Sequence, residues 1–187
     1  AWPPTYQAFG DYYGTYRAMQ KALEAGKVRA IGLSNFVDAR FVDFVENMEV
    51  KPAVLQLETH VFSQQKRMRE LMAPYGTRLM AWAPLAEGRN GIFTHPTLTA
   101  IGAKYGKTAA QTALCFLMAE DVIAIPKSVH RERLVENFSI DDFELSAEDL
   151  DAIRALDGGK PMCADFNDPT LAKFLLEYDA KFNPERQ

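Results

Sequence analysis

Residues 26–36 read GKVRAIGLSNF, in which the apolar run Val28–Leu33 lies between a glycine and the polar pair Ser34-Asn35. A short run of β-branched and aliphatic residues is typical of a strand buried in a parallel sheet. Three further runs of four or five residues have the same character, and these are Ala53–Leu57, Leu79–Ala83 and Val122–Ile125. The pattern therefore predicts four strands.

Segments with helical periodicity lie before, between and after these runs. They are Tyr12–Glu24, Asp38–Asn47, Gln64–Pro74, Thr108–Ala119, Arg131–Asn137 and Ser146–Leu156. Gly26 stands where a C-cap belongs, and Thr108 with Gln111 has the spacing of a capping box. Strands joined through helices form right-handed βαβ units with parallel strands, so the predicted class is α/β. No linker divides residues 1–187, which predicts a single unit.

Composition narrows the class of protein. The chain has 187 residues, a formal charge of −4 and 48% hydrophobic residues, which argues against disorder. We expect no membrane span and no signal peptide. Without clustered cations along the chain, we expect no nucleic-acid partner. Cys115 and Cys163 are too few for a disulfide framework, which favours a cytoplasmic location, and the scattered histidines predict no metal site.

Polar and aromatic residues follow the predicted strands, where parallel α/β folds bind ligands. They are Ser34 and Asn35 after the first strand, Gln56 and Glu58 in and after the second, Trp82 at the third, and Lys127 and Ser128 after the fourth. Other interpretations remain open, since Ser34-Asn35 could cap the next helix and Trp82 could belong to the core.

The fourth strand end has the more specific pattern. Residues 125–133 read IPKSVHRER, which places Lys127, Arg131, Arg133 and the Ser128 hydroxyl where a strand leads into a helix. The unpaired N–H groups at a helix N-terminus and added cations favour an anion such as phosphate. The alternative is that both arginines belong to a solvated helix face.

Five segments together carry a resemblance to a known family. The stretches at 26–36 and 125–137 closely match two signatures of the aldo-keto reductases. DYYG at 11–14, KPAVLQLETH at 51–60 and AWAPL at 81–85 look similar to the same family, especially its bacterial branch similar to 2,5-diketo-gluconate reductases. The resemblance covers nearly all of residues 7–175. It implies a (β/α)8 TIM barrel, NADPH as cofactor, and small aldehydes or ketones as substrates.

The resemblance also implies roles for individual residues. Ser34, Asn35 and Gln56 would orient the nicotinamide carboxamide, and Trp82 would stack on the nicotinamide ring. Leu85, Glu87 and Gly88 lie in a loop similar to the one that closes over the pyrophosphate. Lys127, Ser128 and Arg133 match positions that grip the 2′-phosphate, and Glu136 and Asn137 match those that face adenine. The neighbouring motif residues Ala83, Pro84, Ile125, Pro126 and Val129 complete the predicted cofactor-binding set.

The chain also departs from the family pattern. The tyrosine, lysine, aspartate and histidine of family catalysis belong to the first four barrel strands, and we find none of those motifs, so no catalytic residue is assigned. Trp2-Pro3 resembles the segment after the histidine, whereas YQAFG at 6–10 would put Tyr6 in its place; we favour the second alignment. Tyr12, Tyr13, Tyr75 and Tyr105 are expected to be packing residues.

The expectation is therefore a partial barrel. It comprises about four C-terminal βα units and a preceding helix at residues 7–157, a C-terminal tail at 158–187, and unassigned residues 1–6. Such a half-barrel would expose two strand edges. The primary hypothesis is the C-terminal half of an aldo-keto reductase, a family that reduces aldehydes and ketones with NADPH, without its catalytic residues. One alternative is a non-catalytic NADP-binding or self-associating protein. The other is that the N-terminal half exists in the native protein and is absent from this sequence, which begins with alanine.

Overall fold

The computed structural model describes residues 12–168, 170–171, 173–174 and 177. Its sheet has four parallel strands in the order β1-β2-β3-β4. Their bounds are β1 Gly32–Ser34, β2 Val54–Glu58, β3 Arg78–Trp82 and β4 Ile123–Ala124. Each strand pairs with its sequence neighbour, as expected for consecutive units of a barrel. This confirms the predicted α/β class.

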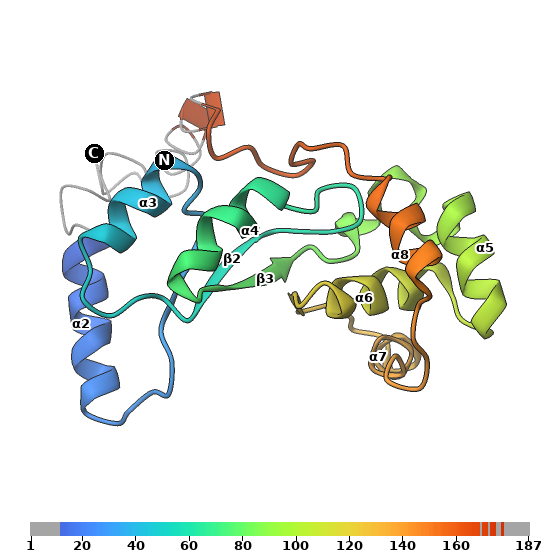
Figure 1. Cartoon of the computed structure of the whole chain (residues 1–187), viewed down its shortest axis with the longest axis horizontal. Coiled ribbons are helices and arrows are strands. Elements are labelled where there is room, and N and C mark those ends of the chain that lie inside the picture. Colours follow the sequence, from blue (N-terminus) through green and yellow to red (C-terminus); the bar gives the residue numbers. More distant parts are fainter. Residues whose placement is uncertain (1–11, 169, 172, 175–176, 178–187) are drawn as a thin grey trace.

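Helices connect and cover the strands (Figure 1). They are α2 Tyr12–Glu24, α3 Ala39–Glu46, α4 Lys66–Met72, η1 Ala73–Tyr75, η2 Ala86–Thr94, α5 Pro96–Tyr105, α6 Ala109–Ala119, α7 Arg131–Phe138 and α8 Ala147–Arg154. The bounds of α2 are those predicted. None of the helices in the described ranges is long and apolar enough to cross a bilayer.

The first strand is shorter than predicted. The run Val28–Leu33 contributes only Gly32 and Leu33 to β1, and 41% of Val28 is exposed. Gly32 pairs with Val54, so continuing the ladder backwards would set Ala30 opposite Pro52. Proline has no N–H to donate to a ladder, which explains why pairing stops there.

The predicted helix ends are confirmed by their hydrogen bonds. Gly26 has φ +68°, and the following amide of Lys27 donates to the carbonyl of Ala22 at 2.9 Å, which closes α2. Thr108 and Gln111 form a reciprocal capping box at the start of α6. Ser146 accepts from the amide of Asp149 and caps α8. The predicted C-terminal tail at 158–187 falls partly outside the described residues.

The core lies between the sheet and its helices. Phe44 of α3 is fully buried and packs against the rings of Tyr12, Tyr16 and Phe36 at centroid distances of 5.9, 4.9 and 5.1 Å. Leu55 and Leu57 of β2 are buried as well. This packing fixes the strands, and with them the strand ends that were predicted to bind a ligand.

Candidate cofactor site

Four of the predicted residues meet at the carboxyl ends of β1–β3. Ser34 is the register partner of Gln56, and the amide of Asn35 donates to the carbonyl of Gln56 at 2.9 Å. The Trp82 Nε1–H donates to Asn35 Oδ1 at 2.9 Å. This bond fixes the orientation of the indole ring. Trp82 is half-buried, so part of its surface remains accessible.

Ser34 and Asn35 do not cap the next helix. The N-cap of α3 is Asp38, and it makes no side-chain capping bond. Asn35 instead has φ 60°, a left-handed conformation that asparagine tolerates better than most residues. The alternative interpretation of this pair as a helix cap is therefore wrong, and its polar side chains belong to the strand-end cluster.

The loop after β3 is irregular. Ala83, Ala86, Glu87 and Asn90 all have φ between 49° and 52°. Left-handed conformations at residues with a side chain cost about 1–3 kcal/mol each, so surrounding contacts must hold them. Gly88 has φ +76°, and a Cβ there would lie 3.3 Å from the Phe93 ring. The sequence analysis missed η2, which this loop contains.

A cavity of about 580 Å³ lies where this loop meets the segment after β4. Its lining unites Leu85 and Phe93 of the loop with Thr108 and Ala110 of α6, and with Lys127, Ser128, Val129, His130, Arg133, Glu136 and Asn137. Seven of the predicted cofactor residues thus surround one space. Its size lies within the range of small-molecule sites.

The cavity offers cationic groups to a ligand. Within the described part of the chain, Lys127 and Arg133 form no ion pair. Ser128 lies two residues before the N-cap His130 of α7 and accepts from its amide at 3.1 Å. Two cations without carboxylate partners, a hydroxyl and a helix N-terminus suit a phosphate group. Glu136 is held by Thr108 Oγ1, which donates to it at 2.6 Å.

Other predicted residues lie away from this lining. The Glu87 carboxylate pairs with Arg89 at 3.2 Å, and Gly88 belongs to the same turn. Pro84 is buried, whereas 44% of Ile125 is exposed. Pro126 lines a different cavity of about 610 Å³, which Asn137 also borders. Some of the motif residues therefore line the cavity beside α7, and others lie outside it.

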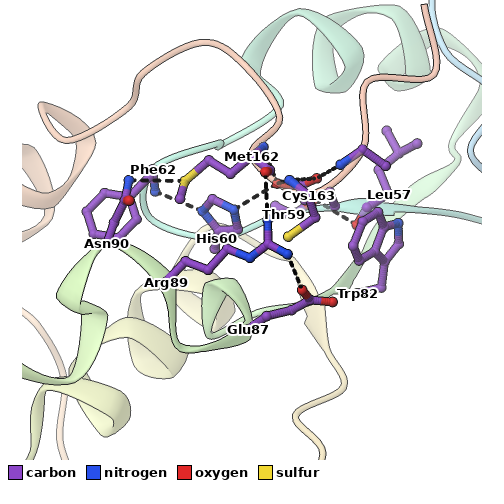
Figure 2. A network of polar contacts seen from close by, with 12 residues as sticks. Leu57, Thr59, His60, Phe62, Trp82, Glu87, Arg89, Asn90, Met162 and Cys163 are labelled. Atoms are coloured by element: carbon purple, nitrogen blue, oxygen red, sulfur yellow. Dashed lines mark hydrogen bonds and ion pairs between the residues drawn. The ribbon is translucent and has the colours of Figure 1, made fainter. Parts of the chain in front are cut away.

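Glu58, the last residue of β2, was predicted to lie at the ligand-binding strand ends but was given no cofactor contact. Only 3% of Glu58 is exposed, and it is the register partner of Trp82. Its carboxylate accepts hydrogen bonds from His60 and from the amides of Met162, Cys163 and Ala164. Figure 2 shows this network beside Trp82.

These hydrogen bonds decide the ionisation of Glu58. Burial by itself raises the pKa of a carboxyl, but the bonds from His60 and the backbone amides outweigh it and lower the pKa of Glu58 from 4.5 to about 2. The signal available in the sequence was a charged residue directly after an apolar strand. His60 lies two residues away, but the three backbone amides come from residues 162–164, where no local pattern could indicate them.

The predicted packing role of the tyrosines is confirmed, because Tyr12, Tyr13, Tyr75 and Tyr105 are partly buried against the hydrophobic core. Tyr13 donates its hydroxyl to Asp43, Tyr75 to Glu46 and Tyr105 to Asp149. All of these carboxylates lie on the outer helices α3 and α8. Tyr12 packs against Phe36 and Phe44. The alternatives based on Trp2-Pro3 and Tyr6 fall outside the described residues.

Comparisons with known proteins agree with this architecture. The model of the Aldo/keto reductase family matches residues 1–158. The glyoxal reductase of Bacillus subtilis is 41% identical over 145 residues, which are 78% of this chain and 52% of that protein. An aldo-keto reductase from a Medee basin deep-sea metagenome library superposes with a TM-score of 0.80 at 35% identity, covering 85% of this chain and 61% of the other.

A third relative was solved with a cofactor. The Bombyx mori aldo-keto reductase in complex with NADP gives a TM-score of 0.75 at 30% identity over 85% of this chain and 54% of that one. The chain therefore spans about half to three fifths of the length of these relatives. The residues 1–158 matched by the family model include both the strand-end cluster and the lining of the cavity.

Proposed function

The chain belongs to the aldo/keto reductase family, and from this premise we propose that it binds NADPH for the reduction of small aldehydes and ketones to alcohols. The cavity beside α7 carries the proposal, because it unites Lys127, Ser128 and Arg133 with Leu85 of the loop after β3. Unpaired cations around one space favour a phosphorylated cofactor. The glyoxal and D-xylose reductases among the relatives support carbonyl reduction.

In this proposal the residues divide the cofactor between them. Lys127, Ser128 and Arg133 hold the 2′-phosphate, and Glu136 and Asn137 face adenine. The loop of Leu85, Glu87 and Gly88 covers the pyrophosphate. Ser34, Asn35 and Gln56 orient the carboxamide, while the indole of Trp82 offers a flat face to the nicotinamide. NADPH, when bound, supplies the hydride to a carbonyl carbon, and the protein orients and shields it.

Arg133→Met tests the phosphate contact. Charge-assisted hydrogen bonds contribute about 1.5–3 kcal/mol, so we expect NADPH to bind roughly ten- to a hundredfold more weakly. NADH has no 2′-phosphate, and its affinity should stay unchanged. Isothermal titration of both cofactors measures this, with Arg131→Met as the control, because Arg131 does not line the cavity. Equal losses for both cofactors would contradict the assignment.

Catalysis needs a proton donor besides the cofactor. We predict that the family's catalytic tetrad of tyrosine, lysine, aspartate and histidine is missing from this chain, so the 187 residues alone should bind NADPH without turning substrate over. The assay follows NADPH absorbance with small aldehydes and diketones. Robust turnover by the isolated chain would contradict the missing tetrad while supporting carbonyl reduction.

A second candidate function is association with another protein surface, either a second copy or a separate N-terminal half. Large apolar side chains on α7 favour it, because Leu134, Val135 and Phe138 are 48%, 57% and 84% exposed. Leu134 and Phe138 line the cavity of about 610 Å³ beside β4, the last described strand. Apolar surface of this kind marks interaction sites. Sedimentation equilibrium distinguishes an associating chain from a monomer.

A further inference from the structure

The buried carboxylate of Glu58, at the end of β2, binds backbone amides of a segment that is distant in the sequence. Glu58 accepts from the amides of Met162 at 2.5 Å, Cys163 at 2.9 Å and Ala164 at 3.1 Å. Three consecutive N–H groups turned to one point form a concave anion-binding nest. The segment Met162–Ala164 is thereby tied to the strand end that lies beside Trp82.

His60 completes the ring of donors around this carboxylate. It is fully buried, and its Nδ1 accepts from the amide of Phe62 at 3.2 Å. A neutral imidazole that accepts at Nδ1 carries its proton on Nε2. His60 Nε2–H therefore donates to Glu58 Oε1 at 3.1 Å. The His60 Nε2–H and the three backbone amides are all hydrogen-bond donors. The Glu58 carboxylate can therefore accept from every one of them only when it is ionised.

The segment Met162–Ala164 in turn holds the loop after β3. The Met162 carbonyl accepts from Arg89 Nη1 at 3.1 Å, and its sulfur lies 3.5 Å from Asn90 Nδ2 (Figure 2). Glu87 and Asn90 have left-handed backbones, which a free loop would not favour. Contacts to Met162 thus help to fix the loop that carries Glu87 and Gly88.

We propose that Glu58 is a positioning residue for cofactor binding, because its carboxylate fixes Met162–Ala164 and this segment fixes the loop of Glu87–Asn90. The inference rests on the proposed function for the ligand, but the mechanical connection stands on the contacts alone. Glu58 touches no part of the cavity beside α7. Its influence should therefore reach the pyrophosphate and nicotinamide end and spare the 2′-phosphate end.

Glu58→Gln is the direct test. The glutamine side chain is nearly isosteric with glutamate. Its NH2 group, however, would face a backbone N–H donor at a position where the glutamate offers an acceptor oxygen. The chain that precedes Met162–Ala164 has hydrogen bonds that do not depend on Glu58. Gln64 Nε2 donates to the Ile153 carbonyl at 2.9 Å, and the Gly158 amide donates to the Phe62 carbonyl at 2.9 Å. The variant is therefore expected to fold.

Amide hydrogen exchange without cofactor tests whether Glu58 fixes the segment Met162–Ala164 and, through it, the loop of Glu87–Asn90. In Glu58→Gln we expect exchange at least about tenfold faster at residues 162–164 and also at 86–91. In Arg89→Met, which removes the next contact, only 86–91 should exchange faster. Asp149→Asn is the matched control, because Asp149 is a buried carboxylate held by Lys104 and Tyr105 away from this loop. It should leave both segments as in the wild type.

Cofactor titration measures the functional part. We expect Glu58→Gln to weaken NADPH about tenfold (about 1.4 kcal/mol) and to leave adenosine 2′,5′-bisphosphate unchanged. Unchanged exchange at 86–91, or equal weakening of both ligands, would overturn the positioning role. Failure of the wild type to bind either ligand would overturn the proposed function instead, and the cofactor-free exchange data would still decide whether Glu58 holds the loop.

Discussion

Glu58 makes stability depend on pH in a defined window. Its pKa is about 2 in the folded chain and 4.5 as an ordinary carboxyl, so the unfolded state binds the proton more readily. The contribution of the ionised Glu58 to the free energy of unfolding is complete above pH 4.5 and is lost as pH falls towards 2. A pKa difference of this size corresponds to a contribution of roughly 3 kcal/mol.

Urea denaturation at several pH values isolates this contribution. The free energy of unfolding of Glu58→Gln should fall below that of the wild type by roughly 3 kcal/mol at pH 7. The gap should narrow steadily between pH 4.5 and 2. Glu120 and Asp149, whose pKa values are also lowered, are common to both proteins and cancel in the comparison. A gap that stays constant over this range would contradict the low pKa.

Single residues also show where sequence analysis reaches its limit. Lys127, Ser128 and Arg133 follow one another closely, and the structure brings them to one cavity because one turn and one helix carry them. Apart from His60, the donors to the Glu58 carboxylate are backbone amides, which every residue except proline possesses. Nothing in the side chains of Met162, Cys163 or Ala164 announces an anion nest, so this contact was open only to the structure.

Among the helices, α6 begins with a cap that also joins a second element. Thr108 Oγ1 accepts from the Gln111 amide at 3.2 Å and donates to Glu136 of α7 at 2.6 Å. Thr108→Ala should lower the free energy of unfolding by about 1–2 kcal/mol. Thr108→Ser keeps the hydroxyl and should remain within about 0.5 kcal/mol of the wild type. Chemical denaturation monitored by circular dichroism measures both; equal stability of the alanine and serine variants would contradict the cap.

Element bounds were predictable where side chains signal them. Gly26 and the Thr108 cap fixed the end of α2 and the start of α6 correctly. The helix α5 was missed, although Pro96 at its first turn and Gly106 after its end are recognised signals. The first strand was predicted too long, because the apolar run at Val28 carries no information about Pro52 on the neighbouring strand.

For the molecule as a whole, the parallel sheet could be predicted from the sequence and surface exposure could not. Alternating strands and helices predicted parallel strands, the family resemblance implied neighbours in chain order, and the order β1-β2-β3-β4 agrees with both. Among the described strands, β1 and β4 each have one neighbour. Periodicity marks the apolar side of α7 without telling what covers it, and only the structure shows that Phe138 is 84% exposed.

This exposure leads to a prediction about assembly. A second copy turned about a two-fold axis could set its β1 edge beside β4 with parallel strands and cover Leu134, Val135 and Phe138. We expect sedimentation equilibrium to show a concentration-dependent dimer of the 21.0 kDa chain. Phe138→Asp should weaken this dimer at least about tenfold, because a carboxylate would have to be buried. Arg131→Gln changes charge equally on the same helix and should associate like the wild type; a wild-type monomer at all concentrations would contradict self-association.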